Sequence, residues 1–214
     1  MSTTRAATDR AWPSAAWVLA ALLLLCVPAL AAEEPSSGAS ERISATVDEV
    51  LGVLNDPALD SGGRRQRIES IAYELFDFGT VSRLVVAKHW KRFSPEQQGE
   101  LVQQFKAYLS HSYGERIDRY NQEQVELVGE RPEQRGDVTV FTRVLGGQYE
   151  GAEVDYRMRE IEGRWRAIDV KVEGVSLVLN YRDQFKSILG RKGPEGLLEA
   201  LRKKSAEASG VEES

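Results

Sequence analysis

The sequence predicts an α+β domain in which an antiparallel four-stranded meander packs against a group of helices and encloses an apolar cavity. Three observations lead to this prediction. Apolar residues recur at helical spacing from residue 43 to about residue 120, the period changes to two after Asn121, and helical spacing returns near the C-terminus. Helices grouped beside one run of antiparallel strands are typical of this fold class.

Four helices are expected before the sheet. Their apolar residues are spaced three and four apart, and the helices cover residues 43–54, 68–76, 77–86 and 95–120. The start of the last one is the most strongly marked. Ser94 can cap the helix, Pro95 suits its first position, and Gln97 follows the cap by three residues, which is a capping-box arrangement.

The strands are expected at residues 125–129, 138–144, 154–158 and 165–172, with a tight turn at Glu162-Gly163 before the last. Two helices, at residues 180–189 and 195–204, close the domain. Because side chains alternate across a strand, the third strand should point one set inward and the other outward. The inward set is Val154, Tyr156 and Met158, and the outward set is Asp155, Arg157 and Arg159.

The N-terminus is typical of a secretory signal peptide. Arg5 and Arg10 precede an apolar run over residues 15–27, and Ala29-Leu30-Ala31 offers a cleavage site after Ala31. The alternative is an uncleaved membrane anchor, but the run is shorter than the roughly 20 residues that span a bilayer. We therefore expect a signal peptide over 1–31, a flexible leader over 32–40, one domain over 41–204 and a disordered tail over 205–214.

Composition excludes several function classes. The formal charge is −5, and removal of residues 1–31 changes it to 26 minus 32, or −6, which disfavours nucleic-acid binding. The only cysteine, Cys26, lies inside the signal peptide, and Leu25 before it does not fit a lipoprotein signal. The exported chain therefore has no disulfide, no thiol nucleophile and no cysteine metal ligand.

No reactive constellation is evident, so we expect no enzyme, no metal and no cofactor. His89 and His111 lie on different predicted helices without metal-ligand spacing. Residues 174–178 lack the final glycine of a nucleophile elbow, so Ser176 is interpreted as a turn or capping residue. The competing hypothesis is a cone-shaped enzyme with an acid in its pocket, but Asp155 and Asp169 fall on the strand faces opposite the apolar ones.

A set of short motifs occurs in order over roughly residues 43–204. The motifs are Phe76-Asp77-Phe78, Arg83-Leu84-Val85, Trp90, Ser94-Pro95-Glu96-Gln97, Phe105, Tyr113, Trp165, Asp169-Val170, Gly174-Val175-Ser176, Asn180-Tyr181-Arg182 and Phe185. Together they resemble the MlaC (toluene-tolerance) family of periplasmic phospholipid-binding proteins.

The resemblance implies a shuttle that carries phospholipid across the periplasm, with the acyl chains in a cavity between sheet and helices. It implies exchange with an outer-membrane lipoprotein complex and with an inner-membrane ABC transporter that has an MCE-domain subunit, and we expect a monomer. A related branch that binds hopanoids, or another hydrophobic ligand, stays open.

Twelve residues are expected to contact lipid, although the same side chains could instead fill an ordinary core. They are Leu84, Leu109, Tyr113, Val140, Tyr156, Met158, Val170, Val172, Val175, Leu177, Tyr181 and Phe185. In this hypothesis Asn180 caps a helix whose Tyr181 and Phe185 close the cavity. Arg182 then meets either a phosphate or partner, or a nearby acid, and the sequence does not decide between them.

Overall fold

The computed structural model describes residues 38–114, 120 and 122–208, and the expected signal peptide falls outside them. The helices are α1 (Gly38–Leu54), α2 (Ser61–Leu75), α3 (Phe78–Val86), α4 (Pro95–Gly114) and α5 (Leu177–Ala208), with the short 3-10 helices η1 (Ala87–Arg92) and η3 (Gln134–Gly136). The strands are β1 (Gln124–Pro132), β2 (Val138–Leu145), β3 (Glu153–Ile161), β4 (Arg164–Val172) and β5 (Val175–Ser176). Within the described part, no helix has the length and apolarity needed to cross a membrane.

The predicted α+β class is confirmed, with one strand more than expected. The five strands form one sheet in the order β1-β2-β3-β4-β5, and each pairs antiparallel with the next. The ladder shifts register at Leu127/Gly129 on β1 and at Arg157/Met158 on β3. The additional strand, β5, has only two residues, which is too short for a period of two to be recognised.

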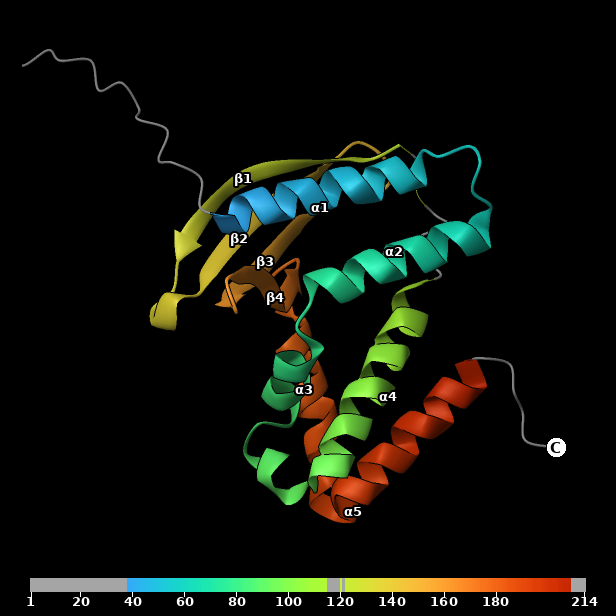
Figure 1. The fold of residues 1–214 in the computed structure, drawn as a ribbon, viewed down its shortest axis with the longest axis vertical. Helices are drawn as coiled ribbons and strands as arrows, with labels where there is room; N and C mark the ends of the chain where they lie inside the picture. Colours follow the sequence, from blue (N-terminus) through green and yellow to red (C-terminus); the bar gives the residue numbers. More distant parts are fainter. Residues whose placement is uncertain (1–37, 115–119, 121, 209–214) are drawn as a thin grey trace, which may run out of the picture. The chain divides into compact units, whose positions relative to one another are not determined.

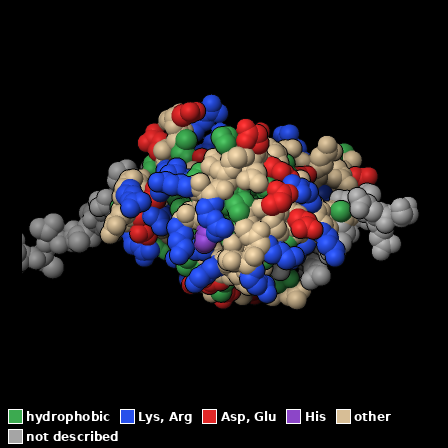
Figure 2. All heavy atoms as spheres, turned by 90° about the horizontal axis from the view of Figure 1, so that it is seen from below, with side chains coloured by type: hydrophobic (Ala, Val, Ile, Leu, Met, Phe, Trp, Pro, Cys, Tyr) green, Lys and Arg blue, Asp and Glu red, His purple; other side chains and the backbone are tan. Residues whose placement is uncertain are grey.

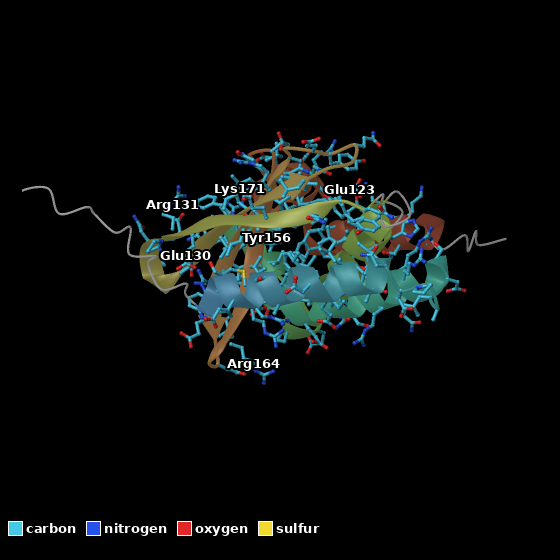
Figure 3. All side chains as sticks on the ribbon, turned by 90° about the horizontal axis from the view of Figure 1, so that it is seen from above. Glu123, Glu130, Arg131, Tyr156, Arg164 and Lys171 are labelled. Carbon is cyan, nitrogen blue, oxygen red and sulfur yellow. The ribbon has the colours of Figure 1, made fainter. Side chains whose placement is uncertain are left out.

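The predicted faces of β3 are confirmed. Met158 is 0% exposed, and Tyr156 packs against the same apolar cluster that contains Met158. The view from above shows Tyr156 between β1 and α1 (Figure 3). The alternate residues Arg157 and Arg159 bind Asp137 on the outer face of the sheet.

The apolar residues form two clusters. The sheet cluster lies between α1 and the inner sheet face and contains Ala39, Ile43, Leu75, Val138, Val140, Met158 and Ala167. The helical cluster lies among α3, α4 and α5 and is built around Phe105, Tyr181, Phe185, Leu189 and Leu197. Figure 1 shows this division, with α1 running along the strands and α3, α4 and α5 gathered together. The space between the two clusters is where a pocket can form.

Helix α1 begins at Gly38, inside the segment expected to be a flexible leader. Ala39 is fully buried, and the Ser40 hydroxyl donates to Glu130 of β1. A Cβ at Gly38 would lie 2.9 Å from the indole nitrogen of Trp165, so glycine allows the helix start to approach β4 closely. Helix α1 thus includes residues 38–40, which precede the expected domain start at residue 41.

The capping box at α4 is confirmed in both directions. The backbone N–H of Gln97 donates to the Ser94 hydroxyl at 3.3 Å, and the backbone N–H of Ser94 donates to the side-chain oxygen of Gln97 at 3.1 Å. Two backbone donors at the helix start are thereby satisfied, as the sequence predicted.

Helix α5 begins three residues earlier than expected, and Asn180 does not cap it. The Ser176 hydroxyl accepts from the Leu179 amide at 3.1 Å, and Asp169 accepts from the Val178 amide at 3.0 Å. Ser176 also donates to Asp169 at 2.6 Å, so the cap is tied to β4. The interpretation of Ser176 as a capping residue is confirmed, and the hairpin from β4 to β5 leads directly into the helix.

The two expected C-terminal helices are two arms of α5. Gly193 has φ 68° and ψ −167°, which interrupts the helix, and Pro194 follows it. Glycine tolerates positive φ and proline suits the first turn of a new helix, so this pair changes the chain direction. The second arm extends to Ala208 and so includes the first four residues of the tail expected over 205–214.

Arg182 has a structural role that neither sequence alternative anticipated. Its guanidinium donates two hydrogen bonds to the Leu84 carbonyl oxygen, at 3.0 and 2.7 Å. Helix α3 ends at Val86, and Ala87 has φ 47°, a left-handed conformation that is uncommon for a non-glycine residue. Arg182 thus satisfies a carbonyl in the last turn of α3 and joins it to α5.

Replacement of Arg182 tests this contact. We expect Arg182→Ala to lower the free energy of unfolding by about 2 kcal/mol, because a carbonyl in a half-buried site loses a charged donor. Arg182→Lys should recover part of the loss, since a lysine has the charge without the two-pronged geometry. Urea unfolding measures both variants. Equal stability of wild type and Arg182→Ala would contradict the assigned role.

Asp137 is the centre of an ion-pair cluster on the outer sheet face. Its side chain is 0% exposed and accepts from Arg157 at 2.9 Å and from Arg159 at 2.7 and 2.9 Å. Burial alone would raise the pKa of Asp137. The hydrogen bonds and charges of Arg159 and Arg157 outweigh burial and hold that pKa below its ordinary value.

The lowered pKa of Asp137 predicts a pH-dependent stability difference. The ionised carboxylate stabilises the folded state above its unfolded pKa of about 3.9. That contribution is lost as pH falls through the still lower folded pKa. We expect Asp137→Asn to lose about 2 kcal/mol at neutral pH, with the difference from wild type shrinking below about pH 4. Denaturant titrations across pH measure it, and a difference that grows in acid would contradict the assigned pairing.

Candidate functional site

A pocket of about 810 Å³ lies between the sheet and the helices. Its floor comes from the inner faces of β3 and β4, and its walls come from α2 and the C-terminal half of α4. The starts of α3 and α5 complete it. The lining residues are Arg65, Ile68, Glu69, Ala72, Tyr73, Phe76, Phe78, Val81, Ala107, Leu109, Ser110, His111, Tyr113, Gly114, Val154, Tyr156, Val170, Val172, Val175, Ser176, Leu177 and Asn180.

The sheet side of the pocket is apolar because of strand alternation. Val154 pairs with Val172 and Tyr156 pairs with Val170 across β3 and β4, so four side chains form one continuous surface. Burial raises the pKa of the Tyr156 phenol. This surface offers acyl or other hydrocarbon groups an area without charge.

The helix side has one polar group of contacts. The Tyr73 hydroxyl of α2 bonds to Glu69 and lies 2.7 Å from the Ser110 hydroxyl of α4. The Lys106 ammonium stands 3.3 Å from the centroid of the Tyr73 ring. Burial, followed by the hydrogen bond with Glu69, raises the pKa of Tyr73 to about 12. These contacts join α2 to α4 and place polar groups on the helix side of the pocket.

Part of the lining reaches the protein surface. Val175 is 63% exposed, Val172 is 48% exposed and Tyr113 is 41% exposed, although all three also line the pocket. Glu173 and Gly174 both have positive φ and form the turn that places Val175 there. We call these three residues the apolar rim. Through them the pocket is continuous with the exterior.

Seven of the twelve residues predicted to contact lipid line this pocket. They are Leu109, Tyr113, Tyr156, Val170, Val172, Val175 and Leu177. The other five lie elsewhere. Val140 and Met158 belong to the sheet cluster, whereas Tyr181 and Phe185 belong to the helical cluster and Leu84 packs against it.

Sequence reasoning missed the contribution of α2. Ile68, Ala72 and Phe76 are four apart and line the pocket, and Tyr73 adds the polar contact. The spacing was recognised as a helical stripe, but a stripe alone does not reveal whether a helix covers a filled core or an open pocket. Tyr73 and Glu69, also four apart, were the available signal for a polar position beside that stripe.

One acidic side chain, Glu69, lines the pocket, and it accepts a hydrogen bond from the Tyr73 hydroxyl. Neither Asp155 nor Asp169 lines the pocket, so the acid required by the cone-shaped enzyme hypothesis is not supplied by them. In residues 38–114, 120 and 122–208, His, Cys, Asp and Glu form no group of three that could hold a metal ion. Of the two histidines, His111 lines the pocket and His89 does not.

Comparisons with known proteins agree on one family. The model of the MlaC protein family matches residues 44–203. The toluene tolerance protein ttg2D of Pseudomonas putida is 26% identical over 115 residues, which is 54% of this chain and 54% of that protein. The chain thus aligns with about half the length of this curated relative.

A solved structure agrees in fold. The phospholipid-binding protein from Ralstonia solanacearum, determined in complex with a phospholipid, matches with a TM-score of 0.72 and 24% identity. The match covers 81% of this chain and 99% of that chain. Since the family model extends from within α1 to within the second arm of α5, it includes the sheet and every pocket-lining residue, and the chain belongs to the MlaC protein family.

Proposed function

We propose that this protein is a non-catalytic carrier that binds one phospholipid with its acyl chains in the pocket. The observation that carries the proposal is the apolar sheet surface that continues through the apolar rim to the exterior. A pocket of about 810 Å³ falls within the range of about 300–1,000 Å³ usual for ligand sites. The phospholipid in the Ralstonia solanacearum relative supports this ligand class over a hopanoid.

Hydrocarbon transfer explains why a carrier is needed. Two acyl chains of about sixteen carbons expose around thirty methylene groups, and at about 0.8 kcal/mol each their hydration costs on the order of 25 kcal/mol. A protein pocket that replaces bilayer contacts makes the transfer nearly balanced. The carrier then needs no energy source, and the direction of transport must come from its partners.

The setting that fits such a carrier is the periplasm, between an outer-membrane lipoprotein complex and an inner-membrane ABC transporter with an MCE-domain subunit. Support comes from the family membership and from the N-terminal sequence pattern of a signal peptide. In this proposal Tyr113, Val172 and Val175 contact the acyl chains as they enter and leave. The polar contacts of Tyr73 lie where the chains meet the helix side.

Native mass spectrometry of the purified protein, followed by organic extraction, tests the proposal. We expect one phospholipid per protein molecule and the release of the same mass on extraction. A protein that remains empty after incubation with phospholipid vesicles and a lipid-loaded relative would overturn the carrier function. A hopanoid mass in place of phospholipid would retain the carrier and change its ligand.

A further inference from the structure

One end of this acidic protein carries a concentration of positive charge. The cations come from α3, η1 and α5, all are exposed, and we call them the basic end: Arg83, Lys88, Lys91, Arg92, Lys186, Arg191 and Lys192. Figure 2 shows Lys and Arg side chains gathered around a histidine on the face seen from below. The whole chain has a formal charge of −5, so without these seven cations it would be −12.

The two segments that supply the basic end contain no acidic residues, and they lie side by side in the fold. Neither residues 83–92 nor residues 186–192 contain Asp or Glu. The Arg92 guanidinium of η1 lies 3.0 Å from His89 Nδ1 and donates to the Leu189 carbonyl of α5 at 3.4 Å. Trp90, half-buried, packs against the helical cluster and fixes η1 in place. The two basic segments therefore form one surface.

The positive charge of the basic end is not neutralised within the protein. Among the described residues, none of the seven cations has a carboxylate oxygen within 4 Å, whereas nearby Arg202 pairs with both Glu100 and Glu195. Partial burial, followed by the charges of Arg92 and Lys88, lowers the pKa of His89, which agrees with a positive local field. Such a surface attracts anions over a Debye length of about 10 Å at 0.1 M salt.

The residue types at the basic end favour binding to the headgroup phosphates of a bilayer over binding to a specific protein partner. Specific protein interfaces usually have an apolar centre. The large hydrophobic residues that are exposed in the described part all lie elsewhere, at Tyr113, Leu127, Val128, Leu145, Tyr149, Val172, Val175 and Leu179. Lysines with long, mobile side chains suit headgroups whose positions are not fixed. We propose that the basic end binds the surface of an anionic phospholipid bilayer through headgroup phosphates.

The basic end is separate from the pocket, so this inference does not depend on the proposed cargo. None of its seven residues lines the pocket. Along α4, the pocket begins at Ala107, and η1 with Lys88, Lys91 and Arg92 comes just before the first turn at Pro95, which at 1.5 Å per residue is about 18 Å away. Arg83 lies nearer, two residues after the pocket-lining Val81 on α3. Attachment by the basic end concentrates the protein at a bilayer while leaving the apolar rim accessible to a partner.

Sedimentation with vesicles tests the inference. Wild-type protein should bind vesicles that contain about 30 mol% phosphatidylglycerol, fail to bind pure phosphatidylcholine, and dissociate at high salt. The variant Lys88→Gln/Lys91→Gln/Lys192→Gln should lower the partition coefficient about 100-fold, since each cation lost near an anionic surface reduces binding about fivefold. The variant Lys88→Glu/Lys91→Glu/Lys192→Glu should lower it further, because the anionic surface also repels the three new carboxylates. A graded loss from the glutamine to the glutamate variant follows charge, which a general loss of folding would not.

A charge-matched control reverses three cations outside the basic end, Arg135 of η3 and Arg164 and Lys171 of β4. Arg135→Glu/Arg164→Glu/Lys171→Glu has the same net charge as the glutamate variant of the basic end, and Figure 3 labels two of these positions, Arg164 and Lys171, on the strands. It should retain binding within about threefold. If both glutamate triple variants lose vesicle binding equally, binding depends on the net charge of the protein and not on the basic end, and the inference is overturned. Absence of wild-type binding to anionic vesicles would also overturn it, and would leave an acidic protein as the partner of this end.

Discussion

Val170→Glu is expected to fold and to purify with less than about one tenth of the wild-type phospholipid. Val170 lies on β4, faces the pocket and is paired with Tyr156. A carboxylate there would lie against the acyl chains, where an unpaired charge is costly to bury, so either the lipid or the charge must leave. An empty pocket has room for water around the new carboxylate, which is why we expect the fold to tolerate it.

The control for Val170→Glu is the neighbouring residue. Lys171 lies on the opposite strand face and pairs across the sheet with Asp155. Lys171→Glu places two carboxylates opposite each other, which should cost about 0.5 kcal/mol of stability and leave the lipid content unchanged. Quantitative extraction from equal amounts of folded protein compares the two variants. The same lipid content in both would mean that the inner face of β4 does not contact cargo.

The parts of the fold that follow local rules could be predicted from the sequence. Alternation placed Tyr156 inward and Arg157 outward because a strand has a fixed period of two. The reciprocal bonds of Ser94 and Gln97 were predictable because both partners lie within one helical turn. In each case the interaction that decides the structure lies within a few residues of the chain.

The parts that sequence reasoning missed depend on distant contacts. Asp169 caps α5 from a neighbouring strand, which explains why the helix begins at Leu177 and not at Asn180. Arg182 binds the Leu84 carbonyl, 98 residues away along the chain, so no local pattern could indicate it. The pocket residues could not be identified for a similar reason. An apolar stripe shows which face of a helix is buried, but it does not show whether that face packs against other side chains or lines a pocket.

Tyr181 and Phe185 illustrate this limit. Their spacing of four correctly places them on one helical face, but that face packs against α4 within the helical cluster. The Phe105 ring centre lies 5.1 Å from that of Tyr181 and 5.4 Å from that of Phe185, both in edge-on geometry. Burial, followed by the neighbouring phenols of Tyr113 and Tyr108, raises the pKa of the Tyr181 phenol. Tyr181 is thus also the link between the helical cluster and Tyr113 at the apolar rim.

Phe185→Ala is therefore expected to lower the free energy of unfolding by about 3–5 kcal/mol, the usual cost of truncating a phenylalanine in a filled core. Tyr113→Ala is the matched aromatic control. Its side chain lines the pocket and is 41% exposed, so truncation should cost about 1 kcal/mol or less.

Lipid content should change in the opposite order, because Tyr113 belongs to the proposed cargo site and Phe185 does not. Molecules of Phe185→Ala that remain folded should keep their phospholipid, whereas Tyr113→Ala should purify with less. Chemical denaturation and lipid extraction on the same preparations measure both properties. A Phe185→Ala protein with wild-type stability and no lipid would place this residue at the cargo and reverse the assignment, because a wall beside open space tolerates truncation and a filled core does not.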